Sequence, residues 1–77
     1  MKKTILVTGA SSGIGRATAN LFQEKGWNVI ATMRSPEKET KLNALENTLV
    51  TKLDVLDLYT IDSALTQGIE KFGKIDV

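Results

Sequence analysis

The sequence has no cysteine and no histidine among its 77 residues, and it has only one proline. Without cysteine the chain cannot form a disulfide scaffold, and without either residue it cannot form the usual zinc sites of thiolate and imidazole ligands. The lack of histidine also removes the side chain that most often serves as a general base near neutral pH. We therefore expect no metal site of these kinds and no histidine-based catalysis within the chain.

The sequence also lacks a large excess of charge of either sign, and it lacks a long apolar run. Ten lysines and arginines stand against nine aspartates and glutamates, which leaves a net charge of +1. A balance this even does not favour a nucleic-acid partner. The chain begins with basic residues, but the apolar run of residues 5–7 is too short for a signal peptide or a membrane span. We therefore expect a cytoplasmic protein without a membrane or nucleic-acid partner.

Along the chain, apolar residues occur in short runs in some segments and at helical spacing in others. Short runs rich in apolar and β-branched residues predict strands at residues 4–7, 27–33 and 48–53. In the second run, Val29-Ile30-Ala31 is apolar without interruption, which indicates burial on both faces, as in a parallel sheet. Apolar residues at helical spacing predict two amphipathic helices, at residues 13–25 and 58–72. Gly26 and Gly73 stand where helices end, and Asp57 is suited to cap the second helix. We expect the apolar stripe from Leu58 to Phe72 to belong to the core.

A third, shorter helix is predicted between the second and third strands. Ser35 is a favourable N-cap, Pro36 suits the first helical position, and Glu37 would lie near the positive end of the helix dipole. We expect this helix to continue to about Leu45. Residues 75–77 have the composition of a fourth strand that has only begun.

The order of these elements predicts an α/β fold of the Rossmann type. It would be a doubly wound parallel sheet with three strands, the start of a fourth, and three helices. In this fold the first strand pairs with the fourth, and the ligand crevice lies between them. Because the fourth strand is only begun, we expect residues 1–77 to be the amino-terminal, incomplete part of one dinucleotide-binding domain.

The strongest motif is the segment Thr8-Gly9-Ala10-Ser11-Ser12-Gly13-Ile14-Gly15, between the first strand and the first helix. Gly9 permits a tight turn, the bare backbone at Gly13 lets a pyrophosphate approach, and Gly15 lets the helix pack closely on the sheet. The helix N-terminus offers free N–H groups to the phosphates, and Ser11 and Ser12 add hydroxyl donors. The alternative is a glycine-rich turn without a ligand, and the strand before it and the helix after it disfavour that alternative.

This G-x-x-x-G-x-G spacing resembles the loop of the main branch of the short-chain dehydrogenase/reductase family, and Thr8 fits the same pattern. Asp54 and Val55 are similar to the family's acidic position after the third strand, which usually contacts the adenine ring. The resemblance implies an oxidoreductase, a homo-oligomer when intact, that transfers a hydride between a nicotinamide and a small carbonyl or alcohol substrate. It implies these cofactor-binding residues: Gly9, Ser11, Ser12, Gly13, Ile14, Gly15, Arg34, Asp54 and Val55.

The choice between NADP(H) and NAD(H) depends on the end of the second strand. NAD-binding domains usually place an acid there to hold the ribose hydroxyls, and the corresponding residue here is near Met33. Arg34 follows and can make a charge-assisted contact with a 2′-phosphate. We therefore expect NADP(H), with NAD(H) as the alternative. The other interpretation of Arg34 is a solvated surface arginine.

No residue of the chain matches the family's catalytic serine, tyrosine or lysine. The only tyrosine, Tyr59, is followed four positions later by Ser63 instead of the lysine of the family's Y-x-x-x-K motif. We therefore assign no catalytic residue within these 77 residues and expect enzymatic activity of the intact protein. The alternative function is a non-catalytic dinucleotide-binding sensor or scaffold with the same fold.

Overall fold

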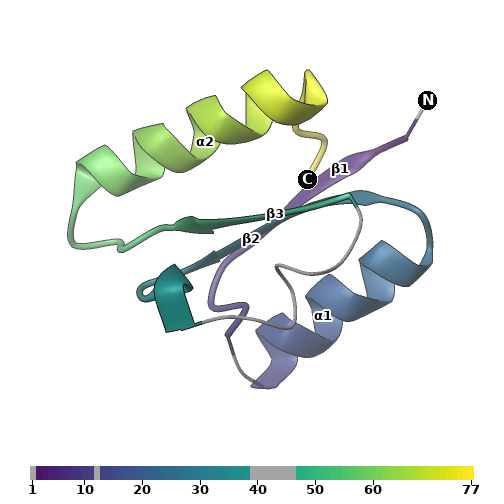
Figure 1. Cartoon of the computed structure of the whole chain (residues 1–77), viewed down its shortest axis with the longest axis horizontal. Coiled ribbons are helices and arrows are strands. Elements are labelled where there is room, and N and C mark those ends of the chain that lie inside the picture. The colour runs from purple at the N-terminus through teal and green to yellow at the C-terminus, as the bar shows by residue number, and fades with distance from the viewer. Residues whose placement is uncertain (1, 12, 39–46) are drawn as a thin grey trace.

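The computed structural model describes residues 2–11, 13–38 and 47–77. Within these ranges the chain forms three strands and two α-helices: β1 (Thr4–Val7), α1 (Gly13–Glu24), β2 (Asn28–Met33), β3 (Thr48–Lys52) and α2 (Leu58–Phe72). The strands are parallel and lie in the order β1-β2-β3. Figure 1 shows α1 on one face of the sheet and α2 on the other. Helices on both faces of a parallel sheet agree with the predicted doubly wound fold, and the boundaries of these five elements differ from the predicted ones by at most one residue.

The segment after β2 differs from the prediction. A 3-10 helix of three residues, Pro36–Lys38, stands where we expected the start of a longer helix. Residues 39–46, which the rest of that prediction covers, lie outside the described residues. The described residues therefore contain two α-helices and one 3-10 turn, where three helices were predicted. Pro36 and Glu37 favour a first helical turn of either type, so these signals locate a turn without deciding its length.

The end of the chain lies along the free edge of β1, as Figure 1 shows. The N–H of Leu6 donates to the carbonyl of Val77 at 2.9 Å, and the N–H of Asp76 donates to the carbonyl of Thr4 at 2.9 Å. These bonds place residues 76–77 where the fourth strand of a 3-2-1-4 sheet belongs. No strand is assigned to residues 74–77, so the predicted fourth strand is represented by these backbone hydrogen bonds alone.

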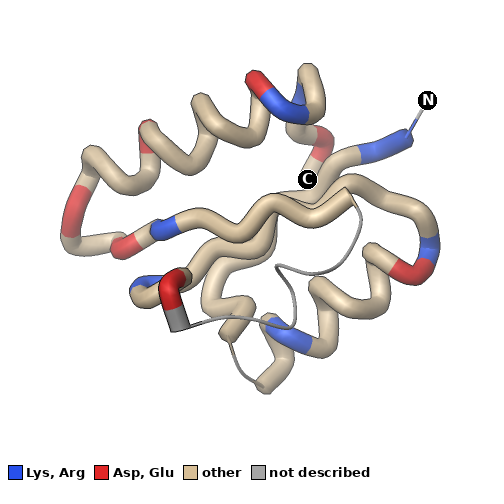
Figure 2. The backbone as a smooth tube through the Cα atoms, in the orientation of Figure 1, with Lys and Arg blue, Asp and Glu red and all other residues tan. Residues whose placement is uncertain are grey.

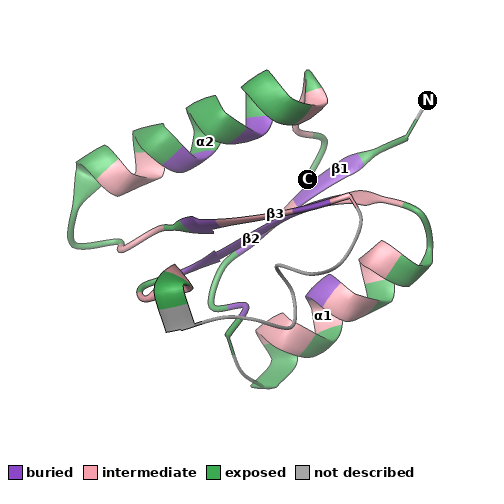
Figure 3. Ribbon diagram, viewed as in Figure 1, coloured by how far each residue is buried: buried purple, intermediate pink, exposed green. Residues whose placement is uncertain are grey.

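The main core lies between the sheet and α1. Alternate strand residues such as Ile5, Val7, Val29 and Ala31 are buried there, together with Ala19 from the helix. Figure 3 shows this burial concentrated along the strands and on the inner sides of both helices. Charged residues lie toward the ends of the strands and on the helices (Figure 2), and the segments of β1 and β2 contain none. The middle of the sheet is thus free of charge in β1 and β2, and charged groups gather toward the strand ends.

The contact face of α2 differs from the predicted apolar stripe. Ala64 and Gly68 are its buried residues, and a Cβ added at Gly68 would collide with the end of the Ile30 side chain. Close packing at these two small residues turns larger members of the stripe toward solvent: Leu58 is 75% exposed, Leu65 38% and Ile69 51%. The prediction that the whole stripe is core is therefore wrong. Neither described helix is long and apolar enough to span a membrane.

Candidate cofactor-binding site

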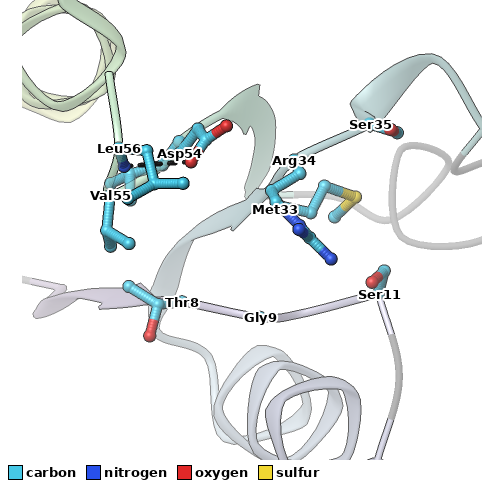
Figure 4. Close-up of a pocket in the computed structure, with 10 residues that line it drawn as sticks. Thr8, Gly9, Ser11, Met33, Arg34, Ser35, Asp54, Val55 and Leu56 are labelled. Carbon is cyan, nitrogen blue, oxygen red and sulfur yellow. Dashed lines mark hydrogen bonds between the residues drawn. The ribbon is translucent and has the colours of Figure 1, made fainter. Parts of the chain in front are cut away.

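A cavity of about 570 Å³ opens at the carboxyl ends of the three strands (Figure 4). In an open α/β sheet this is the edge at which ligands bind. The last residue of β2 and the loops after β1, β2 and β3 supply its lining: Thr8, Gly9, Ser11, Met33, Arg34, Ser35, Leu53, Asp54, Val55 and Leu56. Five of the residues predicted to bind the cofactor are among them: Gly9, Ser11, Arg34, Asp54 and Val55. The fold thus brings together segments that are more than 40 residues apart in the sequence.

The glycine loop makes a sharp turn directly after β1. Gly9 and Gly13 have φ angles of +62° and +58°, a conformation that glycine adopts without the steric penalty of a side chain. A Cβ added at Gly13 would meet no protein atom within 4 Å. Packing therefore does not explain why a glycine stands at this position. The backbone conformation explains it, and so would the approach of a ligand to the exposed main chain.

Gly15 is needed for a different reason. A Cβ at this residue would collide with the carbonyl oxygen of Gly9 and lie 3.0 Å from that of Thr8. The first turn of α1 therefore packs directly on the turn that follows β1. The close packing at Gly15 is therefore against the backbone of the loop, whereas we expected it against the sheet.

The other predicted residues of this loop lie outside the cavity lining. Gly13 and Ile14 are at the exposed start of α1, where Ile14 is 87% exposed. Ser12 lies outside the described residues. The N-terminal turn of α1 nevertheless adjoins the loop that lines the cavity, so its N–H groups are at the same edge of the sheet.

Two residues to which the sequence assigned no role hold the backbone of the loop. Arg16 donates from Nε and Nη2 to the carbonyl oxygen of Ser11, at 3.2 and 3.0 Å. From the opposite side, the carbonyl of Thr32 accepts a hydrogen bond from the N–H of Ala10 at 3.0 Å. Side chains in the first turn of a helix point back toward its N-terminus. The position of Arg16 directly after Gly15 is therefore the signal that could have identified it.

The two residues at the end of β2 differ in burial. Met33 is 3% exposed and belongs to the core, although part of it borders the cavity. Arg34 is exposed, and its guanidinium points across the cavity toward Gly9 and Ser11 (Figure 4). Of these two residues, only Arg34 brings a charged group to the cavity. Ser35, half-buried, lines the same side of the cavity.

The junction between β3 and α2 forms the opposite side of the cavity. Oδ1 of Asp54 accepts a hydrogen bond from the N–H of Leu56 at 3.0 Å, drawn as a dashed line in Figure 4. The hydroxyl of Thr60 accepts from the N–H of Asp54 at 2.8 Å and donates to the carbonyl of Asp57. Asp57 begins α2 as its N-cap, as predicted. These bonds hold the Asp54 carboxylate and the exposed Val55 at the cavity, and Thr60 is a contributor that the sequence pattern did not reveal.

Residues 3–77 match the family model of the short chain dehydrogenases. The chain therefore belongs to the short-chain dehydrogenase/reductase family, and the resemblance inferred from the glycine loop is confirmed.

Named relatives agree with this assignment. The chain is 41% identical over 80 residues to oxidoreductase BOA17 of Botryotinia fuckeliana, covering 100% of the chain and 29% of the relative. It is 38% identical over 79 residues to serine 3-dehydrogenase of Rhizobium radiobacter, covering 100% and 32%. The chain thus spans less than a third of the length of these two relatives.

Two solved structures show the same fold at similar coverage. A short-chain dehydrogenase from Streptomyces avermitilis superimposes with a TM-score of 0.87 at 37% identity, over 99% of this chain and 29% of that one. A 3-ketoacyl-(acyl-carrier-protein) reductase from Brucella melitensis, complexed with NADH, has a TM-score of 0.87 at 29% identity, over 96% and 31%. The second structure connects this fold to a bound nicotinamide dinucleotide.

Proposed function

We propose that this chain holds the adenosine and pyrophosphate end of NADP(H) in an oxidoreductase of the short-chain dehydrogenase/reductase type. The observation that carries the proposal is the position of Arg34, which is exposed at the end of β2 and points across the cavity toward the glycine loop. The sequence has no acidic residue between Asn28 and Pro36. A guanidinium in this place favours a 2′-phosphate, and the lack of a carboxylate removes the usual acceptor for free ribose hydroxyls.

The remaining residues fit the other parts of the same cofactor. The exposed backbone at Gly9 and Gly13 and the start of α1 would take the pyrophosphate. Asp54 and Val55, on the opposite side of the cavity, would contact the adenine. When bound, the cofactor supplies the hydride that is exchanged with a carbonyl or alcohol carbon. The residues of this chain bind and orient it, and none of them is assigned to proton transfer.

Two alternatives weigh less. NAD(H) is the alternative cofactor, since the Brucella melitensis reductase was solved with NADH. A non-catalytic sensor is the alternative function, and the names of the relatives, oxidoreductase and serine 3-dehydrogenase, favour an enzyme. The small carbonyl or alcohol substrate, the homo-oligomeric state and the cytoplasmic location stay predictions.

A direct test compares the affinities of the complete gene product for NADPH and NADH, by fluorescence titration at one ionic strength. We expect the smaller dissociation constant for NADPH. Equal affinities, or tighter binding of NADH, would contradict the proposed role of Arg34. Binding of neither dinucleotide would contradict the proposed function as a whole.

A further inference from the structure

Thr32, in β2, is bonded to the chain on both sides of the turn that begins the glycine loop. Its hydroxyl donates to the carbonyl oxygen of Val7, the last residue of β1, at 2.7 Å. Its own carbonyl accepts from the N–H of Ala10 at 3.0 Å. Thr8 and Gly9, the two residues between these points, are exposed and line the cavity. One residue of the neighbouring strand therefore fixes both ends of the segment on which a phosphate would lie.

The burial of position 32 does not by itself explain why the side chain carries a hydroxyl. The side chain is fully buried, and a valine would fill nearly the same space in a strand without bringing a polar atom into the core. The hydroxyl bond also reaches 25 positions along the sequence, from β2 to the point where β1 ends. Its specific consequence is the direction in which the chain leaves β1.

We propose that Thr32 is a positioning residue for the cofactor, whose hydroxyl sets the path of the loop that binds the pyrophosphate. The inference rests on the proposed function and deepens it. Thr32 does not line the cavity, so it acts through Val7 and Ala10 and does not touch the ligand. Because NADP(H) and NAD(H) share the pyrophosphate, Thr32 should affect both cofactors equally, whereas Arg34 should affect only NADP(H).

Two pairs of side chains at this position isolate the hydroxyl. Thr32 and Thr32→Val differ in the hydroxyl at nearly constant volume, and Thr32→Ser and Thr32→Ala differ in the hydroxyl after the methyl has been removed. Thr4→Val is the matched control. Thr4 is also a fully buried threonine, and its hydroxyl accepts from Asn28 Nδ2 at 3.4 Å, at the far end of β1 from the loop.

The measurements are the dissociation constants for NADPH and NADH and the melting temperature of each variant, in the complete gene product. We expect Thr32→Val to raise both dissociation constants by about tenfold and to leave their ratio unchanged. We expect the dissociation constants of Thr32→Ala to exceed those of Thr32→Ser by about the same factor. Thr32→Ser should bind nearly as the wild type despite a lower melting temperature. Thr4→Val should lose stability without losing affinity.

The results separate the two proposals. If affinity follows the melting temperature across all variants, or if Thr32→Val weakens binding no more than Thr4→Val does, the positioning role is refuted while the cofactor site stands. If Thr32→Val does not fold, the serine and alanine pair answers the same question. A wild-type protein that binds neither dinucleotide refutes the proposed function, and this inference with it.

Discussion

The carboxylate of Asp76 accepts a hydrogen bond from the backbone N–H of Thr4 at 2.8 Å, although 72 positions separate the two residues. The same carboxylate lies 3.3 Å from Nζ of Lys74. The backbone donor of Thr4, assisted by Lys74, lowers the pKa of Asp76 below its ordinary value of 3.8. The end of the chain is thus tied to the start of β1, at the edge of the sheet where the fourth strand belongs.

Stability should depend on pH through this contact. Because the pKa of Asp76 is lower in the folded chain than in the unfolded one, its carboxylate stabilises the fold above its ordinary pKa of 3.8, and this contribution is lost as the pH falls through the folded value. We expect Asp76→Asn to be less stable than the wild type at neutral pH, and the two proteins to converge below about pH 4. Denaturant unfolding across this range measures the difference.

Asp62→Asn is the control for the Asp76 prediction, because Asp62 is an exposed aspartate on α2, remote in the sequence from Thr4. It removes the same formal charge without the contact to Thr4. A gap between wild type and Asp76→Asn that stays constant from neutral to acid pH would show that the charge of Asp76 contributes nothing.

Cofactor preference should follow the side chain at position 34. Arg34→Ala should weaken NADPH binding by about tenfold, the loss of one charge-assisted contact at an exposed site, and leave NADH binding nearly unchanged. Arg34→Asp should go further and favour NADH, since it adds an acceptor for the ribose hydroxyls. Titrations with both dinucleotides measure the ratio.

The control for Arg34 is Lys52→Ala, which removes a positive charge from the exposed last residue of β3. Lys52 is absent from the cavity lining, so its loss should change the affinities little. If the lysine variant lowers NADPH affinity as much as Arg34→Ala does, general electrostatic attraction explains the effect and Arg34 has no specific role.

Gly13→Ala should weaken the binding of both dinucleotides. Any L side chain at its φ of +58° costs about 1–2 kcal/mol of stability. Gly26→Ala is the matched control, since Gly26 has a φ of +85°, likewise meets no atom within 4 Å, and lies beyond the other end of α1. Both variants should lose similar stability, and only Gly13→Ala should lose affinity. Normal cofactor binding by a folded Gly13→Ala protein would exclude close approach of the phosphates at this residue.

The packing of α2 on the sheet should be sensitive to one methyl group at Gly68. Alanine is the better helix former by about 1 kcal/mol, but its Cβ would collide with the Ile30 side chain and lie 3.2 Å from Ile30 Cγ1. We expect Gly68→Ala to lower the free energy of unfolding by about 1–3 kcal/mol, the usual cost of overpacking a core.

Adding Ile30→Val, which deletes the terminal methyl that Gly68→Ala meets, should recover part of the loss. Thr66→Ala, at an exposed position of the same helix, is the control for helix propensity. A Gly68→Ala protein that is more stable than the wild type would show that α2 shifts outward at little cost.

Much of the fold and part of the site could be predicted from local patterns in the sequence. The apolar runs marked the three strands, Asp57 capped α2, and Gly73 ended it with its N–H donating to the carbonyl of Ile69. The glycine loop identified the family because its spacing, its preceding strand and its following helix are all contiguous in the chain. Such signals can be recognised in sequence because their physical causes act within a few residues.

Only the tertiary structure decided which side chains the elements present. It buried Met33 and directed Arg34 to the cavity, and it placed Ala64 and Gly68 of α2 against the sheet in place of larger apolar neighbours. It also brought distant partners together, such as Thr32 with Val7 and Asp76 with Thr4.

The physical reason is the range of the interactions. The spacing of apolar residues determines which segments become strands and helices, and it does so locally. The choice of face and of hydrogen-bond partner depends on how closely another element approaches from elsewhere in the chain. For this protein the sequence by itself therefore determined the elements, the loop and the family, and the packing of the elements decided how Arg34, Thr32 and Arg16 are placed around the candidate site.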